Sequence, residues 1–419
     1  MKDIVETQEK NKIVIFLICI ISIFLNHQKP ISGINISISD IALVLLFYIY
    51  LINNELFIPK KVLLFFVFLS ITNLCTSVFI SPNKFNYGLN INSILNDYIK
   101  MVASFLYFLF GYNLVKNRMT MSAYKWYSIM SIFMGGLGIV LVLLDINVFR
   151  SILFYEGSRY VGLMNDPNYF SLIQCSVLVY VINNEQLSKM IKALICASLF
   201  LSIALSGSKT GMIICILYLF VSYMRMLIKN KSYKHISYNL LFLIFIFISG
   251  SLLLSAMQVL MDQLVSINPV IGRIRLLFTD FNAAISANGS IRLKVWTDAI
   301  EIIKQSPLLG VGTGSYLPAR ISYGSGSLAH NTFLQIIAEW GVPFAMLLFL
   351  NMINVFSKTR KFCGSRDMII MRDMLIVFLL GSLSLSLNNA RMLWMFFGVL
   401  YSVSLCENHE EDYRNEAGF

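Results

Sequence analysis

Long apolar runs recur along almost the whole chain, and short polar segments separate them. A membrane-spanning helix needs about 20 predominantly apolar residues, and most of these runs approach that length. The pattern predicts an all-α, polytopic membrane protein with about twelve transmembrane helices in a single membrane domain, residues 1–419. The predicted spans are 13–26, 40–53, 62–80, 93–115, 124–145, 167–183, 190–206, 209–228, 238–258, 332–356, 373–389 and 391–406.

The distribution of Lys and Arg orients these spans. With the amino terminus placed inside, alternate loops carry clusters such as Lys60 and Lys61, and a basic group that begins at Lys358. Short cytoplasmic loops are enriched in Lys and Arg. We therefore expect both termini in the cytoplasm.

One predicted outer segment, residues 259–331, is much longer than the other loops. Loops of this length are usually functional or disordered, and this one has too many apolar residues to be disordered. Residues 291–305 have the spacing of an amphipathic helix, which Pro307 should end. Arg292 falls within its apolar stripe, one turn from Trp296. Arg292 either packs its stem there with its head in water or holds a buried anion.

Four predicted helices begin at the outer face, and each beginning carries polar groups. These helices start at Pro167, Lys209, Asn331 and Arg391. Helix amino termini have free N–H groups and a partial positive charge, so together they predict an anion-binding rim. Lys100, near the outer end of another span, is a fifth candidate. Each residue taken alone is better explained as a cap or an interfacial anchor, and only the four together favour an anion site.

His330 stands at the outer mouth of the tenth span. Histidine has an unperturbed pKa of about 6.5, so a neutral imidazole is available as a base near pH 7. A lone histidine at such a position is also often an interfacial cap. Deeper in the same span, Glu339 is an intramembrane carboxyl group that should pair with a cation or be protonated. Pro343 should kink this helix.

Composition excludes several classes of protein. The chain is 57% hydrophobic and 13% charged, which is too apolar for a soluble domain of 419 residues. The net charge of +11 forms no basic stripe with exposed aromatic residues, so we expect no nucleic-acid partner. The seven cysteines show no metal-ligand spacing, and we expect no metal ion and no cofactor. The "GVGTG" segment is too short for a nucleotide loop, and we interpret it as a flexible turn.

Four motifs in order, "RYVGLMNDPNYF", "SGSKTG", "RLKVWTDAI…P…GVGTGSY" and "AHNTFLQIIAEWG", resemble the O-antigen polymerase and O-antigen ligase superfamily. The resemblance is concentrated in a ligase-like region of about residues 150–400. It implies a bacterial inner-membrane glycosyltransferase that uses an undecaprenyl-diphosphate-linked glycan at the periplasmic or outer face. It also implies a chain-length regulator protein as a partner, besides the lipid bilayer.

The resemblance matches Arg159, Arg292 and His330 to functional positions of the family. We expect His330 to act as base and the two arginines to hold the diphosphate, without a metal ion. Lys209 stands where the family often has arginine, and lysine lacks the bidentate fork. The predicted substrate-binding residues are Lys209, Asn331, Asn168, Arg391, Trp296, Glu339 and Lys100.

Three functions remain open at this stage. A polymerase extends a chain on a lipid-linked repeat unit, and the wording "NDPNYF" favours this branch. A ligase passes the finished chain to lipid A–core. A flippase would move lipid-linked oligosaccharide without bond chemistry, but the chain shows no internal repeat of the kind that transporters carry.

Overall fold

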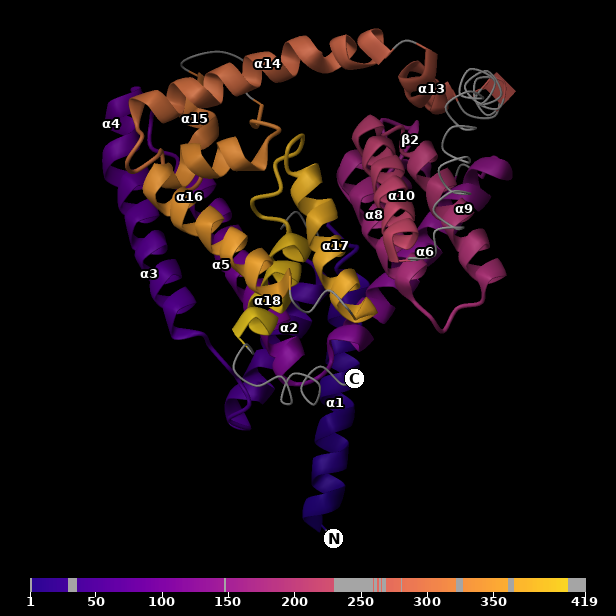
Figure 1. Ribbon diagram of the computed structural model, residues 1–419. Helices are drawn as coiled ribbons and strands as arrows, with labels where there is room; N and C mark the ends of the chain where they lie inside the picture. The colour runs from indigo at the N-terminus through magenta and orange to yellow at the C-terminus, as the bar shows by residue number, and fades with distance from the viewer. Residues whose placement is uncertain are drawn as a thin grey trace. The chain divides into compact units, whose positions relative to one another are not determined.

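The computed structural model describes most of the chain, and the described residues are 2–28, 36–146, 148–229, 259, 262–263, 265, 269–279, 281–321, 327–360 and 365–405. The chain divides into two compact units. Unit 1 comprises residues 1–130 and 290–419, and unit 2 comprises residues 131–289. Figure 1 shows that nearly all of the described chain is helical.

Five helical segments within the described residues are long and apolar enough to cross a membrane. They are Lys60–Phe85, Ile91–Lys116, Thr120–Leu143, Lys209–Met226 and Thr332–Thr359, and shorter apolar helices occupy Lys12–Phe24, Ile38–Ile52 and Arg391–Leu405. The predicted all-α membrane class is confirmed. The number of twelve spans stays a prediction, and the ninth, 238–258, lies outside the described residues.

Unit 1 contains the first helices of the chain and the last. Its elements are α1 (Lys2–Phe24), α2 (Ile38–Ile52), α3 (Lys60–Cys75), the π-helical turn η1 (Thr76–Ile80), α4 (Ser81–Phe85), α5 (Ile91–Lys116), α15 (Tyr316–Ile321), α16 (Thr332–Thr359), α17 (Arg366–Gly381) and α18 (Arg391–Leu405). The carboxyl-terminal part of α14 (Phe281–Gln305) also belongs to it. Residues 382–390 are not helical, so the predicted span 373–389 is wrong in its second half.

Helices α5 and α18 approach each other with their backbones almost in contact. A β-carbon at Gly111 would lie 2.0 Å from the carbonyl oxygen of Met395, and one at Gly398 would lie 2.0 Å from that of Phe108. Small residues at such a crossing let two helices pack by dispersion where hydrophobic burial gives no advantage over lipid. These two glycines therefore fix the closest helix pair of unit 1.

Helix α16 is broken near its middle. Gly341 has φ 78° and ψ 163°, far from helical values, and Pro343 follows two residues later. Proline has no N–H and its ring clashes with the carbonyl group four residues earlier, so the predicted kink is confirmed. The N–H of Val342, which the break frees from the helix, donates to the carbonyl of Pro307 at 2.7 Å.

The loop of residues 307–314 satisfies the carbonyl groups that the break exposes. Val311 donates its N–H to the carbonyl of Ala338 at 2.8 Å, and Gly312 donates to that of Glu339 at 2.9 Å. Irregular backbone at membrane depth is tolerated only where protein groups satisfy it in this way. The break and the loop therefore require each other.

The same loop is anchored on its other side by two serine hydroxyl groups. Ser77 of η1 donates to the carbonyl of Thr313 at 2.8 Å, and Ser93 of α5 donates to that of Gly314 at 2.9 Å. The expectation of a flexible turn at "GVGTG" is wrong. Its glycines have positive φ because neighbouring backbone leaves no room for a side chain at this depth.

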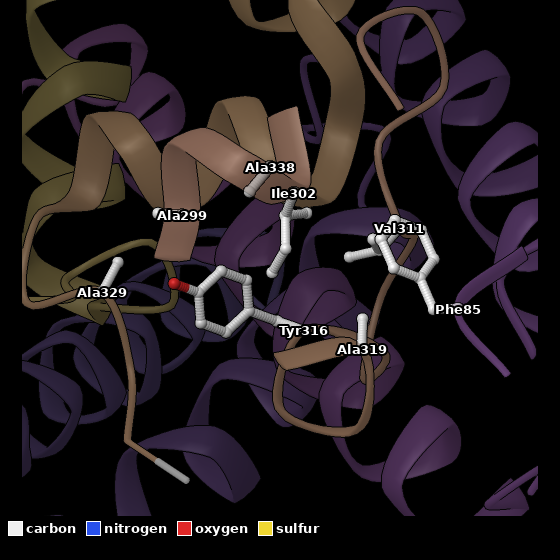
Figure 2. Close-up of a cluster of buried hydrophobic side chains, with 8 residues drawn as sticks. All are labelled: Phe85, Ala299, Ile302, Val311, Tyr316, Ala319, Ala329 and Ala338. Carbon is white, nitrogen blue, oxygen red and sulfur yellow. The ribbon is translucent and has the colours of Figure 1, made fainter. Parts of the chain in front are cut away.

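A hydrophobic cluster packs α14, α15 and the start of α16 together, as Figure 2 shows. Its buried members are Phe85, Ala299, Ile302, Val311, Tyr316, Ala319, Ala329 and Ala338. The predicted end of the amphipathic helix at 305 is confirmed, although the helix begins at Phe281 rather than 291. Val295 and Ala299 of the predicted stripe are fully buried.

Unit 2 is built around a buried helix. Its elements are the last part of α6 (Thr120–Leu143), α7 (Arg150–Leu153), a hairpin of β1 (Phe154–Tyr155) and β2 (Arg159–Tyr160), α8 (Pro167–Asn183), α9 (Lys189–Leu205), α10 (Lys209–Lys229), the 3-10 turn η2 (Pro269–Ile271) and α13 (Gly272–Thr279). Helix α8 packs against both α9 and α10. Tyr160 anchors the hairpin by donating its hydroxyl to the carbonyl of Met134 at 2.7 Å.

Replacing Gly341 by alanine should strongly destabilise the protein. The added methyl group would lie 2.2 Å from the carbonyl oxygen of Leu308, at a φ that by itself costs a non-glycine residue about 1–2 kcal/mol. We expect a loss of more than about 2 kcal/mol, measured as a lower midpoint of thermal unfolding in detergent.

Gly136→Ala is the matched control, because nothing lies within 4 Å of its added methyl group on helix α6. Alanine exceeds glycine in helix propensity by about 1 kcal/mol, so this variant should be as stable as the wild type or more so. Equal midpoints for the two variants would contradict the assigned role of the break.

Candidate functional site

The residues predicted to act on substrate fall in both units. Unit 2 carries Arg159, Asn168 and Lys209. Unit 1 carries the other seven, which are Arg292, Trp296, His330, Asn331, Glu339, Lys100 and Arg391. The contacts of each side chain show which of these residues are bound by other protein groups and which are not.

In unit 2, the β1–β2 hairpin holds Arg159 against the amino-terminal ends of two helices. Its Nε donates to the carbonyl of Ser206 at 2.9 Å, and its Nη2 lies 3.3 Å from Oδ1 of Asn168 and 3.4 Å from the carbonyl of Gly207. Asn168 is the second residue of α8, and Gly207 stands just before α10. The guanidinium thus lies where two sets of helix N–H groups begin.

Local sequence explains how α8 starts at this place. Asp166 is the N-cap, and its Oδ1 accepts the N–H groups of Asn168 at 2.7 Å and Tyr169 at 3.0 Å. Pro167 follows as the first helical residue, where a missing N–H has no cost. The predicted cap is confirmed. The cap leaves the amide side chain of Asn168 free to face Arg159.

A second arginine, Arg273 of α13, lies beside Arg159. A β-carbon at Gly207 would lie 3.4 Å from Nε of Arg159 and 3.4 Å from Cδ of Arg273, so the two side chains flank this glycine. Burial, and next the charge of Arg273, lower the pKa of Arg159 to about 10, although Asp166 acts in the opposite direction. Within the described residues, neither arginine has a carboxylate as ion-pair partner.

Sequence reasoning did not identify Arg273. It lies in "IGRIRLLF" two positions before Arg275, and only the fold separates the surroundings of the two arginines. Arg275 forms an exposed ion pair with Asp262, with Nε 2.7 Å from Oδ1. Arg273 is exposed and Arg159 is partly buried, and an anion bound by both guanidinium groups would offset the repulsion between them. This cluster of Arg159, Arg273, Gly207 and Asn168 is called the arginine pair site below.

In unit 1, His330 occupies a constrained backbone position at the entrance to α16. Its φ is 48°, in the left-handed region that histidine adopts more readily than most residues. Its N–H donates to Oγ of Ser386 at 3.1 Å. Thr332 adds a backbone bond to the carbonyl of Ser382 at 2.8 Å. The loop of residues 382–390 therefore holds the backbone from which the imidazole of His330 extends.

The side chain of Asn331 is the N-cap of α16. Its Oδ1 accepts the N–H groups of Phe333 at 3.0 Å and Leu334 at 3.1 Å. The amide oxygen is thereby used by the helix, as in other N-caps. This geometry gives Asn331 a role in placing its neighbour His330.

Glu339 is buried and held by two amides. Its Oε1 accepts from Nε2 of Gln335 at 2.8 Å, and its Oε2 accepts from Nδ2 of Asn388 at 3.2 Å. We expected a cation or a proton to compensate this carboxyl group. The described hydrogen-bond partners are two amides and not a cation, and protonation of Glu339 stays a prediction. Asn388 was not predicted, because its contact with α16 joins residues 49 positions apart.

Helix α14 carries Arg292 and Trp296, whose side chains have no polar partner among the described residues. Arg292 is partly buried, and burial lowers its pKa. The indole Nε1 of Trp296 is buried and has no hydrogen-bond partner in the described structure. Both groups keep the capacity to meet a polar ligand, which fits the interpretation that Arg292 faces an anion.

Two further predicted cations, Arg391 and Lys100, are bound by carboxylates. Arg391 at the start of α18 makes a two-pronged contact with Asp40 of α2, at 2.8 Å from Nε and 2.6 Å from Nη2. Tyr107 donates a further bond to the same carboxylate at 2.8 Å. Lys100 pairs with Asp97 at 2.7 Å, as its sequence spacing suggested. These pairings give Arg391 and Lys100 a structural explanation.

Comparison with known proteins yields one family. A family model described as O-antigen ligase matches residues 194–350. The match includes Arg273, Arg292, His330 and Glu339. No curated protein matches the chain. Within the described residues, no group of three or more His, Cys, Asp or Glu side chains is placed to hold a metal ion.

The Asp40–Arg391 pair is a largely buried ion pair, with 20% of the Asp40 side chain and 12% of the Arg391 side chain exposed. Replacing either residue alone by alanine leaves one largely buried charge without its partner and should destabilise the protein by about 2–3 kcal/mol, somewhat less than for a fully buried pair. The double variant should lose much less than the sum of the two, which thermal unfolding of all four proteins would measure. Asp97→Ala, which breaks a more exposed pair, should cost about 1 kcal/mol or less. Additive losses at Asp40 and Arg391 would contradict the pairing.

Proposed function

We propose that the protein is a membrane glycosyltransferase. The match of an O-antigen ligase family model to residues 194–350 supports this proposal, as does the resemblance of the four motifs to the O-antigen polymerase and ligase superfamily. Its donor is a glycan linked to undecaprenyl diphosphate, and its acceptor is a sugar hydroxyl group. The product that we favour is a longer repeat-unit polymer, as an O-antigen or capsule polymerase would make.

The arginine pair site carries this proposal. A glycosyl diphosphate donor must release a diphosphate whose negative charge rises in the transition state. Guanidinium groups bind phosphate oxygens through two parallel N–H bonds, and they need no metal ion to do so. Arg159 and Arg273 provide two such groups beside helix amino termini, with no carboxylate between them. Arg292 of unit 1 is the third candidate for the diphosphate.

The proposed step is a displacement at the anomeric carbon of the donor sugar. The acceptor oxygen forms a bond to that carbon, and the bond from the carbon to the diphosphate oxygen breaks. The acceptor proton passes to the unprotonated ring nitrogen of His330. The diphosphate leaves with the electron pair, and the arginines compensate its charge. No metal ion or cofactor takes part in the step.

His330 suits the role of base because its backbone is held while its ring remains at the entrance of α16. The bonds from Ser386 and the cap of Asn331 restrain the main chain on both sides of the imidazole. A positioned general base contributes about 10²–10⁴ in rate. The positive φ of His330 has the further consequence that an ordinary side chain there is strained.

Two other functions make different predictions. A ligase would use the same donor site and transfer the finished chain to lipid A–core. A flippase would carry the lipid-linked glycan across the membrane without breaking a glycosyl bond. We further propose that the protein lies in a bacterial inner membrane, with both termini in the cytoplasm and the reactive groups on the outer face. Its proposed protein partner is a chain-length regulator.

Removal of the His330 imidazole should abolish chain extension. His330→Asn is the better variant, because asparagine accepts the left-handed backbone and lacks a base near pH 7. We expect at least a 100-fold lower transfer rate on purified lipid-linked repeat units. In a deletion strain, a surface-polysaccharide gel should show single repeat units on the acceptor and no ladder.

His330→Gly serves as the control for backbone strain, since it relaxes the backbone and also lacks the base. Both variants should be inactive and as stable as the wild type. Full activity of either would rule out the base assignment. Bare acceptor with long chains accumulated on undecaprenyl diphosphate would identify a ligase, and unchanged glycosyl transfer with blocked translocation would identify a flippase.

Arg273→Ala should lower the transfer rate by about 10²–10³, the typical effect of removing one donor of charge stabilisation. Arg273→Lys should recover only part of this, because an ammonium group lacks the planar fork. The neighbouring Arg275→Ala is the matched control and should keep wild-type activity, since that side chain is bound to Asp262 at the surface. Equal loss in both alanine variants would remove the arginine pair site from the mechanism.

A further inference from the structure

Unit 1 contains a cavity of about 210 Å³ between α3, α5, α16 and α18. Its walls are mostly aromatic and aliphatic, and two of its facing rings, Phe66 and Phe105, stack with centroids 4.2 Å apart. Trp340 and Trp394, also in the wall, lie 6.2 Å apart in a stacked arrangement. Three of the four helices belong to the segments long enough to cross a membrane.

A cavity of this kind is not explained by packing or by water. Protein interiors have few voids larger than a water molecule. A water molecule needs two to four polar partners. Water can therefore be held only beside the polar lining residues, which are Lys61, Ser104, Asn351, Asn388 and Asn389, and not along the rest of the wall. The wall therefore fits an apolar ligand.

The cavity is long enough for a lipid chain. Along α16 its wall extends from Trp340, just before the break, to Asn351, and the regular helix from Val342 to Asn351 alone rises about 14 Å at 1.5 Å per residue. This length is roughly half of the hydrocarbon thickness of a bilayer. The cavity thus has the dimensions of a site for a chain that lies within one leaflet.

The polar end of the cavity joins the segment that holds His330. Asn388 lines the cavity and donates to the carboxylate of Glu339. Asn388 belongs to the loop of residues 382–390, whose Ser386 accepts the N–H of His330. A chain in the cavity would therefore place its polar head beside the loop that positions the proposed base.

We propose that this cavity binds the polyisoprenoid chain of a lipid-linked substrate. The inference rests on the proposed function, in which a polymerase uses the isoprenoid carrier for both donor and acceptor. Methyl branches and double bonds pack well against flat aromatic faces such as Phe66 and Trp340. A phospholipid acyl chain is the rival occupant, because Lys61 lies at the opposite end of the cavity.

Photo-crosslinking of the purified protein tests the assignment. The two probes are undecaprenyl diphosphate and a dipalmitoyl phosphatidylglycerol, each with a diazirine on its chain. The isoprenoid probe should label peptides of α3, α5, α16 or α18, and excess unlabelled undecaprenyl diphosphate should prevent this. The acyl probe should label them at least 10-fold less.

Leu69→Trp fills the cavity, since Leu69 is a buried wall residue of α3. It should reduce isoprenoid labelling at least 10-fold. Leu64→Trp is the matched control, because Leu64 lies on the same helix, is 63% exposed and does not line the cavity. If Leu69→Trp fails to fold, Ser104→Leu narrows the cavity from α5 and should reduce labelling in the same direction.

Labelling outside the four helices, labelling unaffected by the filling variants, or equal labelling by the acyl probe would each overturn the assignment. The result is independent of catalysis. Cavity labelling by a protein that transfers no glycan would preserve this inference and refute the proposed function. Glycan transfer with labelling elsewhere would do the reverse.

Discussion

The break in α16 at Gly341 is the constraint on which unit 1 depends. A helix that stops and restarts inside the apolar part of a membrane protein leaves carbonyl and N–H groups that lipid cannot satisfy. Here the loop of residues 307–314 supplies the missing partners, through Val311, Gly312 and Pro307. Since the loop must enter between α16, α3 and α5 to do so, its glycines and the serines that anchor it follow from the break.

The break also places the polar groups of unit 1. Glu339 stands just before it, so its side chain meets Asn388 rather than the next turn of a regular helix. Trp340 turns toward Trp394 and forms part of the cavity wall. A regular helix would bring neither residue to this position. The loop that carries Asn388 also holds the backbone of His330, so fold, cavity and candidate base share one set of hydrogen bonds.

Sequence reasoning succeeded where the signal is local. Apolar run length located the helices, and the cap at Asp166 and the kink at Pro343 follow from the chemistry of single residues. It failed where a residue's role depends on a distant partner. Nothing near Arg391 in the chain indicates Asp40, which lies 351 positions away. The "GVGTG" loop was misread for the same reason, since glycine marks both flexible turns and crowded backbone.

The candidate site becomes sharper when the basic residues of the two units are divided by their partners. Arg391, Lys100 and Arg320 are each bound to a carboxylate, and Arg320 is fully buried against Asp298 at 2.7 Å. Such a cation is already neutralised, and binding an anion would require breaking an ion pair. Arg159, Arg273 and Arg292 have no such partner within the described residues. The spacing of Asp97 and Lys100 indicated one of these pairs, but position in the sequence could not divide the five arginines, which look alike as basic residues in apolar surroundings. The contacts in the structure make this division. They leave Arg159, Arg273 and Arg292 able to bind a diphosphate without first breaking an ion pair.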